Sequence, residues 1–225
     1  MRNKPKSRGV SSHKARMKEA KMYEVPTYAQ TYEFTSSAAS AMMVLKYLNK
    51  NFKMKKDTEF DIWQEAINGS VWHGSRFGLA YSLAKRGASV KIFSNVKDEG
   101  YEKKLAVYEG INLDTLSSAF NEVKKKALAL NVEEQYGVTS LNAIKKQLNK
   151  GNIPIVLVNT KELNDGVDAT PHWVVIKGYD KDTFYINDPY SDSTMAIEPS
   201  LFKNALGFEG DHHMVCVSTR GMKKR

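Results

Sequence analysis

The sequence predicts an α+β fold in a single domain, with a helical region followed by an antiparallel sheet. Apolar residues recur every three or four positions until about residue 149, as in amphipathic helices. After residue 153 the apolar runs are short, rich in Val and Ile, and bounded by turn residues, as in strands. The 225 residues contain no internal repeat or low-complexity linker and suffice for one well-packed domain with two lobes.

The helices are predicted from periodicity and from the residues that begin or end helices. Thr35 is a favourable N-cap for a largely buried helix from Ser36 to Leu48. A strand is expected at 88–93, between two groups of helices. The other expected helices span 55–69 with Asp57 or Thr58 as cap, 75–86 ending at Gly87, 98–131 in two pieces broken near Gly110, and 139–149 ending at Gly151.

The last third of the chain is predicted to supply most of the sheet. Strands are expected at 153–158, 172–178, 183–187 and 214–218. A turn at 178–182 separates the second of these strands from the third, which ends at Asp188-Pro189. In such an antiparallel hairpin, His172 and Asp188 are expected to lie side by side near the same end.

The net charge of +9 is concentrated at the two ends of the chain. Residues 1–22 contain eight Lys or Arg and one Glu, and residues 220–225 contain four Lys or Arg. The segment 23–219 is therefore slightly acidic. We expect two flexible basic tails, 1–22 and 220–225, around one domain at 23–219. Nucleic acid would be contacted only through these tails, because a domain-wide nucleic-acid surface requires a basic domain.

The single cysteine and the N-terminal sequence predict a cytoplasmic protein. Cys216 has no partner for an intramolecular disulfide, and it excludes a zinc site built on several cysteines. It lies in an apolar run and is expected to be a buried, small apolar side chain. The basic N-terminus has no apolar stretch behind it, and no apolar run is long enough to span a membrane.

Three separated segments carry polar side chains whose order and spacing make them candidates for one site. Gln30 precedes Ser36, the first residue of the predicted buried helix, by six positions. His172 begins a strand, and Asp188 ends the next strand 16 positions later. An aspartate beside a histidine can hold its neutral tautomer and support its protonated form. Each residue alone is commonly structural, so the inference depends on their joint order and spacing.

These segments resemble the double-glycine, or bacteriocin-processing, peptidases of the papain-like clan. In those peptidases a Gln is followed six positions later by a Cys that begins the central helix in a Cys-Gly-Pro-Ala context. A Gly-His-Phe-Val-Val strand and an Asp-Pro strand end come later. The resemblance covers about residues 23–218, loosely over 100–135, and includes the strand Pro171-His-Trp-Val-Val. Two further segments, Trp63-Gln-Glu-Ala and His73-Gly-Ser-Arg-Phe-Gly-Leu-Ala, resemble a stand-alone cytoplasmic offshoot of the family.

The resemblance implies a papain-like cysteine peptidase fold that needs no cofactor or metal, and it implies four catalytic positions. Gln30 and the backbone N–H of residue 36 would stabilise the oxyanion. His172 would act as general base and acid, and Asp188 would orient it. A thiol at a helix N-terminus beside a histidine has a lowered pKa and becomes a ready nucleophile. This chain departs from the pattern because Ser36-Ser-Ala-Ala stands where the family has Cys-Gly-Pro-Ala.

Three interpretations of Ser36 stay open, in this order of preference. The serine is a substitution that inactivates a cysteine enzyme, or a natural residue of a non-catalytic binder, or the nucleophile of a working Ser-His-Asp site. The retained Gln30, His172 and Asp188 favour the first. The main hypothesis is therefore an amide-bond hydrolase or acyl transferase acting on a peptide-like or protein substrate through an acyl-enzyme. The alternative is a catalytically inactive papain-fold module that binds a peptide or protein partner.

The remaining histidines do not predict a metal site. His212 and His213 are adjacent on an expected strand, so their side chains point to opposite faces and cannot easily share one ion. The segment His73-Gly74 is expected to shape a turn that lines the cleft. Trp173, next to His172, is expected to point to the other face of the sheet.

Overall fold

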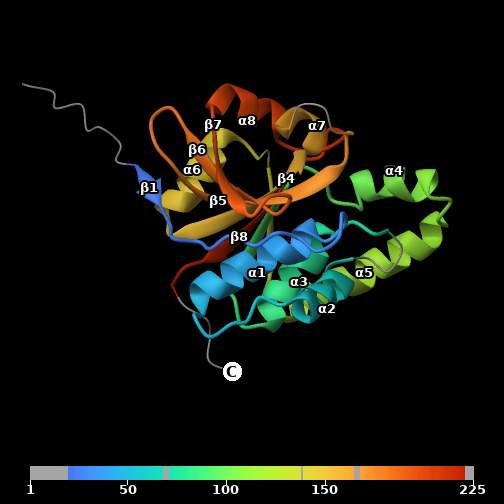
Figure 1. Ribbon diagram of the computed structural model, residues 1–225. Coiled ribbons are helices and arrows are strands. Elements are labelled where there is room, and N and C mark those ends of the chain that lie inside the picture. Colours follow the sequence, from blue (N-terminus) through green and yellow to red (C-terminus); the bar gives the residue numbers. More distant parts are fainter. Residues whose placement is uncertain (1–19, 68–70, 138, 165–167, 221–225) are drawn as a thin grey trace, which may run out of the picture.

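The computed structural model describes residues 20–67, 71–137, 139–164 and 168–220, which form helices packed around one sheet (Figure 1). The described strands follow the order β3-β2-β8-β4-β5-β6-β7, and the short strand β1 pairs with β5 beside this path. All described pairs are antiparallel except β2 with β3, which is parallel. The described elements are β1 (Lys21–Met22), α1 (Ser36–Leu48), α2 (Lys56–Ala66), α3 (Arg76–Lys85), β2 (Val90–Ser94), α4 (Tyr101–Tyr108), α5 (Leu113–Ala129), β3 (Glu133–Tyr136), α6 (Leu141–Asn149), β4 (Asn152–Asn159), α7 (Thr160–Leu163), β5 (Pro171–Tyr179), β6 (Phe184–Asp188), β7 (Ser193–Ile197), α8 (Pro199–Ala205) and β8 (His213–Ser218).

Helices cover both faces of the sheet. Figure 1 shows α1, α2, α3 and α5 on one side and α6, α7 and α8 on the other. Strand β4 lies between them, and six consecutive residues from Ile153 to Val158 are buried. A strand covered on both faces is apolar throughout instead of alternating, which explains the continuous apolar run in the sequence.

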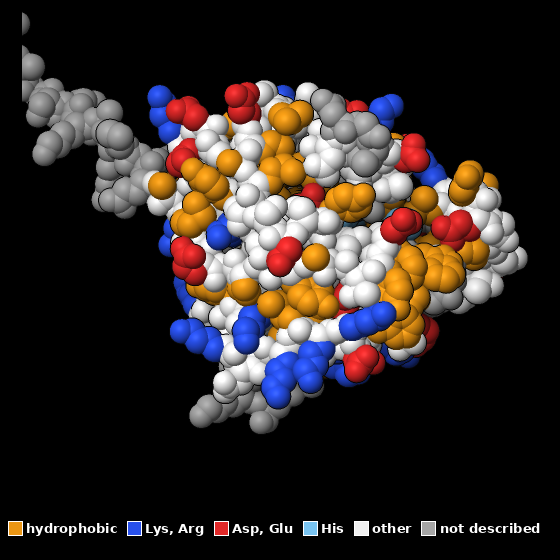
Figure 2. Space-filling view, in the orientation of Figure 1, with side chains coloured by type: hydrophobic (Ala, Val, Ile, Leu, Met, Phe, Trp, Pro, Cys, Tyr) orange, Lys and Arg blue, Asp and Glu red, His pale blue; other side chains and the backbone are white. Residues whose placement is uncertain are grey.

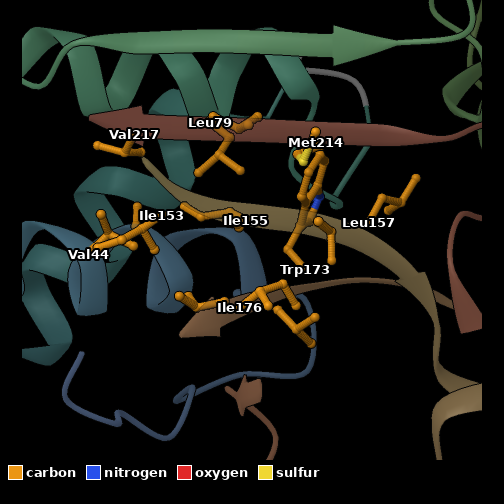
Figure 3. Packing of buried hydrophobic residues seen from close by; sticks show 14 of the residues in the cluster. Val44, Leu79, Ile153, Ile155, Leu157, Trp173, Ile176, Met214 and Val217 are labelled. Atoms are coloured by element: carbon orange, nitrogen blue, oxygen red, sulfur yellow. The ribbon is translucent and has the colours of Figure 1, made fainter. Parts of the chain in front are cut away.

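Helix α1 is the buried element on which the site is built. Its first ten residues, 36–45, are all buried, and Ser40 Oγ donates to the backbone oxygen of Trp173 on β5 at 2.9 Å. Figure 3 shows Val44 of α1 and Leu79 of α3 in the same apolar packing as Ile155 and Trp173 of the sheet. The small side chains at the start of α1 let the helix lie close to β5, which brings its N-terminus to the sheet.

The structure confirms most predicted helices and corrects two of the predicted caps. The helices expected at 36–48, 75–86 and 139–149 are α1, α3 and α6, and the pair broken near Gly110 is α4 and α5. Thr35 stands at the N-cap position of α1, but its hydroxyl makes no capping bond; it lies 2.9 Å from Tyr32 O and also within hydrogen-bond distance of the Glu59 carboxylate. Neither Asp57 nor Thr58 caps α2, because that helix begins at Lys56 and Lys55 occupies its N-cap position.

The division into a helical region and a β region is less complete than predicted. Strand β2 pairs with β8 from the end of the chain, and β3 adds a parallel edge strand. Strands β3 and β7 escape sequence prediction because they lie at the two sheet edges, where side chains are mostly exposed and the apolar alternation is lost. The short helices α7 and α8, which lie between strands, were not expected either.

The predicted tails lie largely outside the described residues. Lys21 and Met22, assigned from sequence to the N-terminal tail, pair with Tyr179 and Gly178 of β5. Residues 1–19 and 221–225 are not described, so the two flexible tails stay a prediction. On the face shown in Figure 2, Lys and Arg side chains are interspersed with Asp and Glu. Within the described chain, no helix has the length and apolar content needed to cross a membrane.

Candidate active site

His172 and Asp188 form a buried hydrogen-bonded pair. His172 lies at the start of β5 and Asp188 at the end of β6, and the register that pairs Val175 with Asn187 brings both to the same end of the hairpin. His172 Nε2 and Asp188 Oδ1 are 2.7 Å apart, and the two residues are only 3% and 2% exposed. The expected side-by-side arrangement of these residues is confirmed.

The carboxylate of Asp188 is held by three donors. Besides His172, the backbone N–H of Tyr190 donates to Oδ1 at 2.9 Å, and Asn164 Nδ2 donates to Oδ2 at 3.4 Å. Burial by itself raises the pKa of Asp188, but the hydrogen bond and charge of His172, followed by these other donors, outweigh burial and lower it. A charged carboxylate at Oδ1 favours the proton on His172 Nε2, which leaves Nδ1 free to accept a proton.

Ser36 lies against the start of the same strand. It is the first residue of α1 and is 4% exposed. The backbone N–H of Trp173, the residue after His172, donates to Ser36 Oγ at 3.3 Å. The first backbone N–H groups of a helix have no partner within the helix, so this position also offers donors to a negative charge. Residues 36, 172 and 188 are thus brought together from two distant parts of the chain.

Gln30 reaches the same site but uses its amide within its own loop. Its backbone N–H donates to Pro189 O at 2.7 Å, which ties it to the end of β6. Its side-chain Nε2 donates to Tyr32 O at 2.9 Å and to Glu33 O at 3.0 Å, whereas its Oε1 is buried without a hydrogen-bond partner. To donate to an oxyanion, Gln30 must release one of these carbonyls, so that role stays a prediction.

A buried carboxylate on α2, Glu59, anchors the loop that carries Gln30. Glu59 is 1% exposed and accepts a hydrogen bond from Tyr28 OH at 3.0 Å. It also accepts from the backbone N–H of Thr31 at 2.8 Å and from the hydroxyls of Thr31 and Thr35. Sequence reasoning missed Glu59, because an acidic residue on an amphipathic helix ordinarily faces solvent and carries no motif of its own.

His172 opens onto a cleft of about 400 Å³, which Gln30 also lines, whereas Ser36 and Asp188 are buried and do not belong to its lining. The cleft walls combine aromatic rings, carboxylates, hydroxyls and imidazoles, and the lining residues are Gln30, Glu33, Phe34, Trp72, His73, Thr160, Asn164, Asp168, Thr170, His172 and Tyr190. His73 lines this cleft, as expected from the sequence. Burial, and then the positive charge of His172, lower the pKa of His73 to about 4, so this imidazole is neutral at neutral pH.

Gly74 fixes the turn that places His73 beside α1. Its carbonyl oxygen accepts from Trp173 Nε1 at 2.8 Å and from Tyr101 OH at 3.0 Å. A Cβ at this position would lie 2.1 Å from Ser37 Oγ, so only glycine allows the turn to pack this closely. The indole of Trp173 therefore points into the interior, away from the cleft, as predicted.

The remaining candidate residues lie away from the cleft. His213 is buried and stacks on Trp173, and burial lowers its pKa well below the ordinary value, so it is neutral. Cys216 is buried on β8, and burial raises the pKa of its thiol, which confirms its expected apolar role. Across the described ranges, no three His, Cys, Asp or Glu side chains are grouped so that they could hold a metal ion.

Comparison with known proteins agrees with the observed fold. A crystal structure from Bacillus anthracis, provisionally assigned as a C39-like peptidase, superimposes with a TM-score of 0.54 and 14% sequence identity. The match covers 90% of this chain and 99% of that one, and at this identity it establishes the fold alone. The model of the family described as Peptidase C39-like matches residues 25–203, a span that includes Gln30, residue 36, His172 and Asp188. The chain has the predicted papain-like α+β fold and belongs to the Peptidase C39-like family.

Proposed function

We propose that the cleft is the site of an amide-bond hydrolase or acyl transferase that acts on a peptide-like substrate, with residue 36 in the nucleophile position. The observation that carries this proposal is the buried pair of His172 and Asp188, 2.7 Å apart, next to Ser36 at the start of α1. Burying an imidazole and a carboxylate is costly unless they are paired, and the retained pair supports proton transfer at residue 36. Membership of a peptidase-like family supports the same class of reaction.

The proposed reaction proceeds through an acyl-enzyme. Asp188 holds the proton on His172 Nε2. Nδ1 therefore takes the proton of the side chain at residue 36 while that side chain attacks the carbonyl carbon of the substrate. The carbonyl electrons move to oxygen, which the backbone N–H of residue 36 stabilises, together with Gln30 once its amide releases a loop carbonyl. The tetrahedral intermediate collapses, the C–N bond breaks, and His172 protonates the leaving amine. Water or a second amine then gives a proton to His172 and attacks the acyl carbon, the bond to residue 36 breaks, and residue 36 takes the proton back from His172.

A thiol suits this arrangement better than the hydroxyl of Ser36. Beside an imidazole and a helix N-terminus, a thiol is ionised near neutral pH, whereas a hydroxyl is not. We therefore interpret Ser36 as a residue that suppresses catalysis in an otherwise retained site. The same serine is the observation that favours the second candidate function, a catalytically inactive module that binds a peptide or protein partner in the cleft.

The two candidates are separated by restoring the thiol. Ser36→Cys is incubated with a pool of labelled peptides, and both the peptides and the intact protein are measured by mass spectrometry. The enzyme proposal predicts shortened or transferred peptides and an acyl adduct on residue 36, both lost in Ser36→Cys/His172→Gln. If the cysteine variant folds but forms neither products nor an adduct, the chain is a binding module.

A further inference from the structure

Among the described residues that line the cleft are two carboxylates, two imidazoles and no Lys or Arg. Glu33 comes from the loop before α1, and Asp168 comes from the segment before β5, so they border the cleft from two different parts of the chain. Lys and Arg make up 34 of the 225 residues, yet none of those in the described ranges lines this cleft. The walls of the cleft therefore differ in charge from the chain as a whole.

Neither carboxylate is neutralised within the described part of the chain. The ion pairs found there involve other acidic residues, such as Glu65, Asp98 and Glu134. Glu33 and Asp168 are both exposed, and no Lys, Arg or His of the described chain lies within ion-pair distance of either. Both remain available to a positively charged group that enters the cleft.

Aromatic rings beside these carboxylates suit a long cationic side chain. Phe34 and Trp72 meet edge to face with ring centroids 4.9 Å apart, and Trp72 is 55% exposed. Tyr190, which also lines the cleft, is 66% exposed. Exposed rings can receive the aliphatic stem of Lys or Arg and attract its charge. The chain itself shows such a contact beside the cleft, where Lys56 Nζ lies 4.9 Å from the ring centroid of Tyr32, which stacks on Phe34.

We propose that the cleft selects peptide segments with a Lys or Arg side chain close to the bond presented to residue 36. The charge of that side chain binds Glu33 and Asp168, and its aliphatic stem lies on the exposed rings. An acidic side chain would be repelled by both carboxylates, and an uncharged one would gain only the contact with the rings. The proposal deepens the proposed function and relies on it only for the reaction, because selective binding does not require turnover.

The test measures how tightly fluorescein-labelled hexapeptide pools bind to the protein that carries its own Ser36. One position is fixed as Lys, Arg, norleucine or Glu, the other positions are a mixture of uncharged residues, and affinity is measured by fluorescence anisotropy. Two solvent-screened ion pairs predict that Lys and Arg pools bind about threefold to tenfold more tightly than norleucine, and that Glu pools bind most weakly. Raising the salt concentration from about 50 mM to about 500 mM should reduce this preference.

Matched variants locate the preference in the cleft. Glu33→Gln/Asp168→Asn should remove the preference for Lys and Arg while leaving norleucine affinity within about twofold. Asp114→Asn/Glu122→Gln makes the same change in net charge on the exposed face of α5 and should keep the preference. Equal binding of the four pools, binding of none, or a preference that survives Glu33→Gln/Asp168→Asn would overturn the proposal.

The outcomes also separate this proposal from the proposed function. If Lys and Arg are preferred but Ser36→Cys forms no acyl adduct, the cleft is a selective binding site without catalysis. If Ser36→Cys turns over peptides with no preference among the four pools, the reaction stands and the selectivity is wrong.

Discussion

The two halves of the site are held in different ways. On the sheet side, His172 and Asp188 take their positions from the pairing of β5 with β6, and Asp188 receives three donors. On the helix side, the side-chain amide of Gln30 donates to carbonyls of its own loop, and that loop is held by the Glu59 carboxylate and by one backbone bond to Pro189. His172 and Asp188 are therefore built into the sheet and residue 36 into a buried helix, whereas the position of Gln30 depends on contacts made by a loop.

This difference shows where the site is complete and where it is altered. The sheet half retains both positions of the family resemblance, His172 and Asp188, whereas Ser36-Ser-Ala, which departs from the family's Cys-Gly-Pro, belongs to the helix half. Of these departures, only residue 36 is a reacting position in the proposed function. Replacing Ser36 alone should therefore restore chemistry, whereas damage to either half should remove it. The predictions below test each half, beginning with the largest expected effect.

Disrupting the sheet half of the site should reduce the reaction rate by the largest factor. In a Ser36→Cys background, Asp188→Asn removes the charged acceptor that holds the His172 proton, and the rate of acyl-enzyme formation with a p-nitrophenyl ester should fall about 100-fold or more. Asp182→Asn, an exposed acid in the turn of the same hairpin, is the control and should leave the rate unchanged. Equal rates for the two variants would show that Asp188 does not act through His172.

Disrupting the loop contacts of the helix half should reduce the free energy of unfolding. Glu59→Ala removes the acceptor of the partly buried Tyr28 hydroxyl and of the Thr31 backbone N–H, and the free energy of unfolding should fall by about 2 kcal/mol in urea denaturation. Glu59→Gln keeps one acceptor oxygen and should cost less. Glu122→Ala, on an exposed face of α5, is the control, and a loss from Glu59→Ala no larger than the control's would contradict the anchoring role.

The contact between the His73-Gly74 turn and α1 can be tested at Gly74. Gly74→Ala forces a Cβ against Ser37 Oγ and should reduce the free energy of unfolding by about 1–3 kcal/mol. Ser37→Gly removes the obstructing side chain, so the two changes together should cost less than their sum in a double-mutant cycle. If the two changes in unfolding free energy were simply additive, the turn would not be in close contact with Ser37 of α1.

The smallest expected effect is the pH dependence contributed by His73. Its pKa is about 4 in the folded chain and ordinary in the unfolded chain, so the unfolded chain binds more protons between these values. Stability should therefore be lost as the pH falls from about 6.5 towards 4, by about 1–2 kcal/mol once partial solvent screening is allowed for. His73→Asn should flatten this part of the curve of unfolding free energy against pH, and an unchanged slope would contradict the assignment.

Periodicity and spacing predicted much of the fold and of the sheet half of the site. The buried run of β4, the helix starting at Ser36 and the proximity of His172 to Asp188 all follow from local patterns and the geometry of a hairpin. The C39-like fold was reached through resemblance, because no local pattern specifies how α1 packs on β5. The catalytic roles of the four residues stay predictions.

The parts that sequence reasoning missed depend on contacts between distant residues. Glu59 bonds to a loop 24 to 31 positions away, and only the packing of α2 beside that loop makes it a buried acceptor. The use of the Gln30 amide within its own loop depends on loop conformation, which spacing does not specify. The edge strands β3 and β7 pair on one side only and lack the apolar pattern of buried strands.

The most direct test of the central claim is the pH dependence of alkylation in Ser36→Cys. Cys216 is buried with a raised pKa, so it should not react and leaves residue 36 as the reporting thiol. If residue 36 faces a functional His172–Asp188 pair, its thiol should react with iodoacetamide well below the ordinary thiol pKa of about 8.5, and His172→Gln should abolish this shift. A thiol at residue 36 that titrates like an exposed cysteine placed by Ser193→Cys would contradict the account.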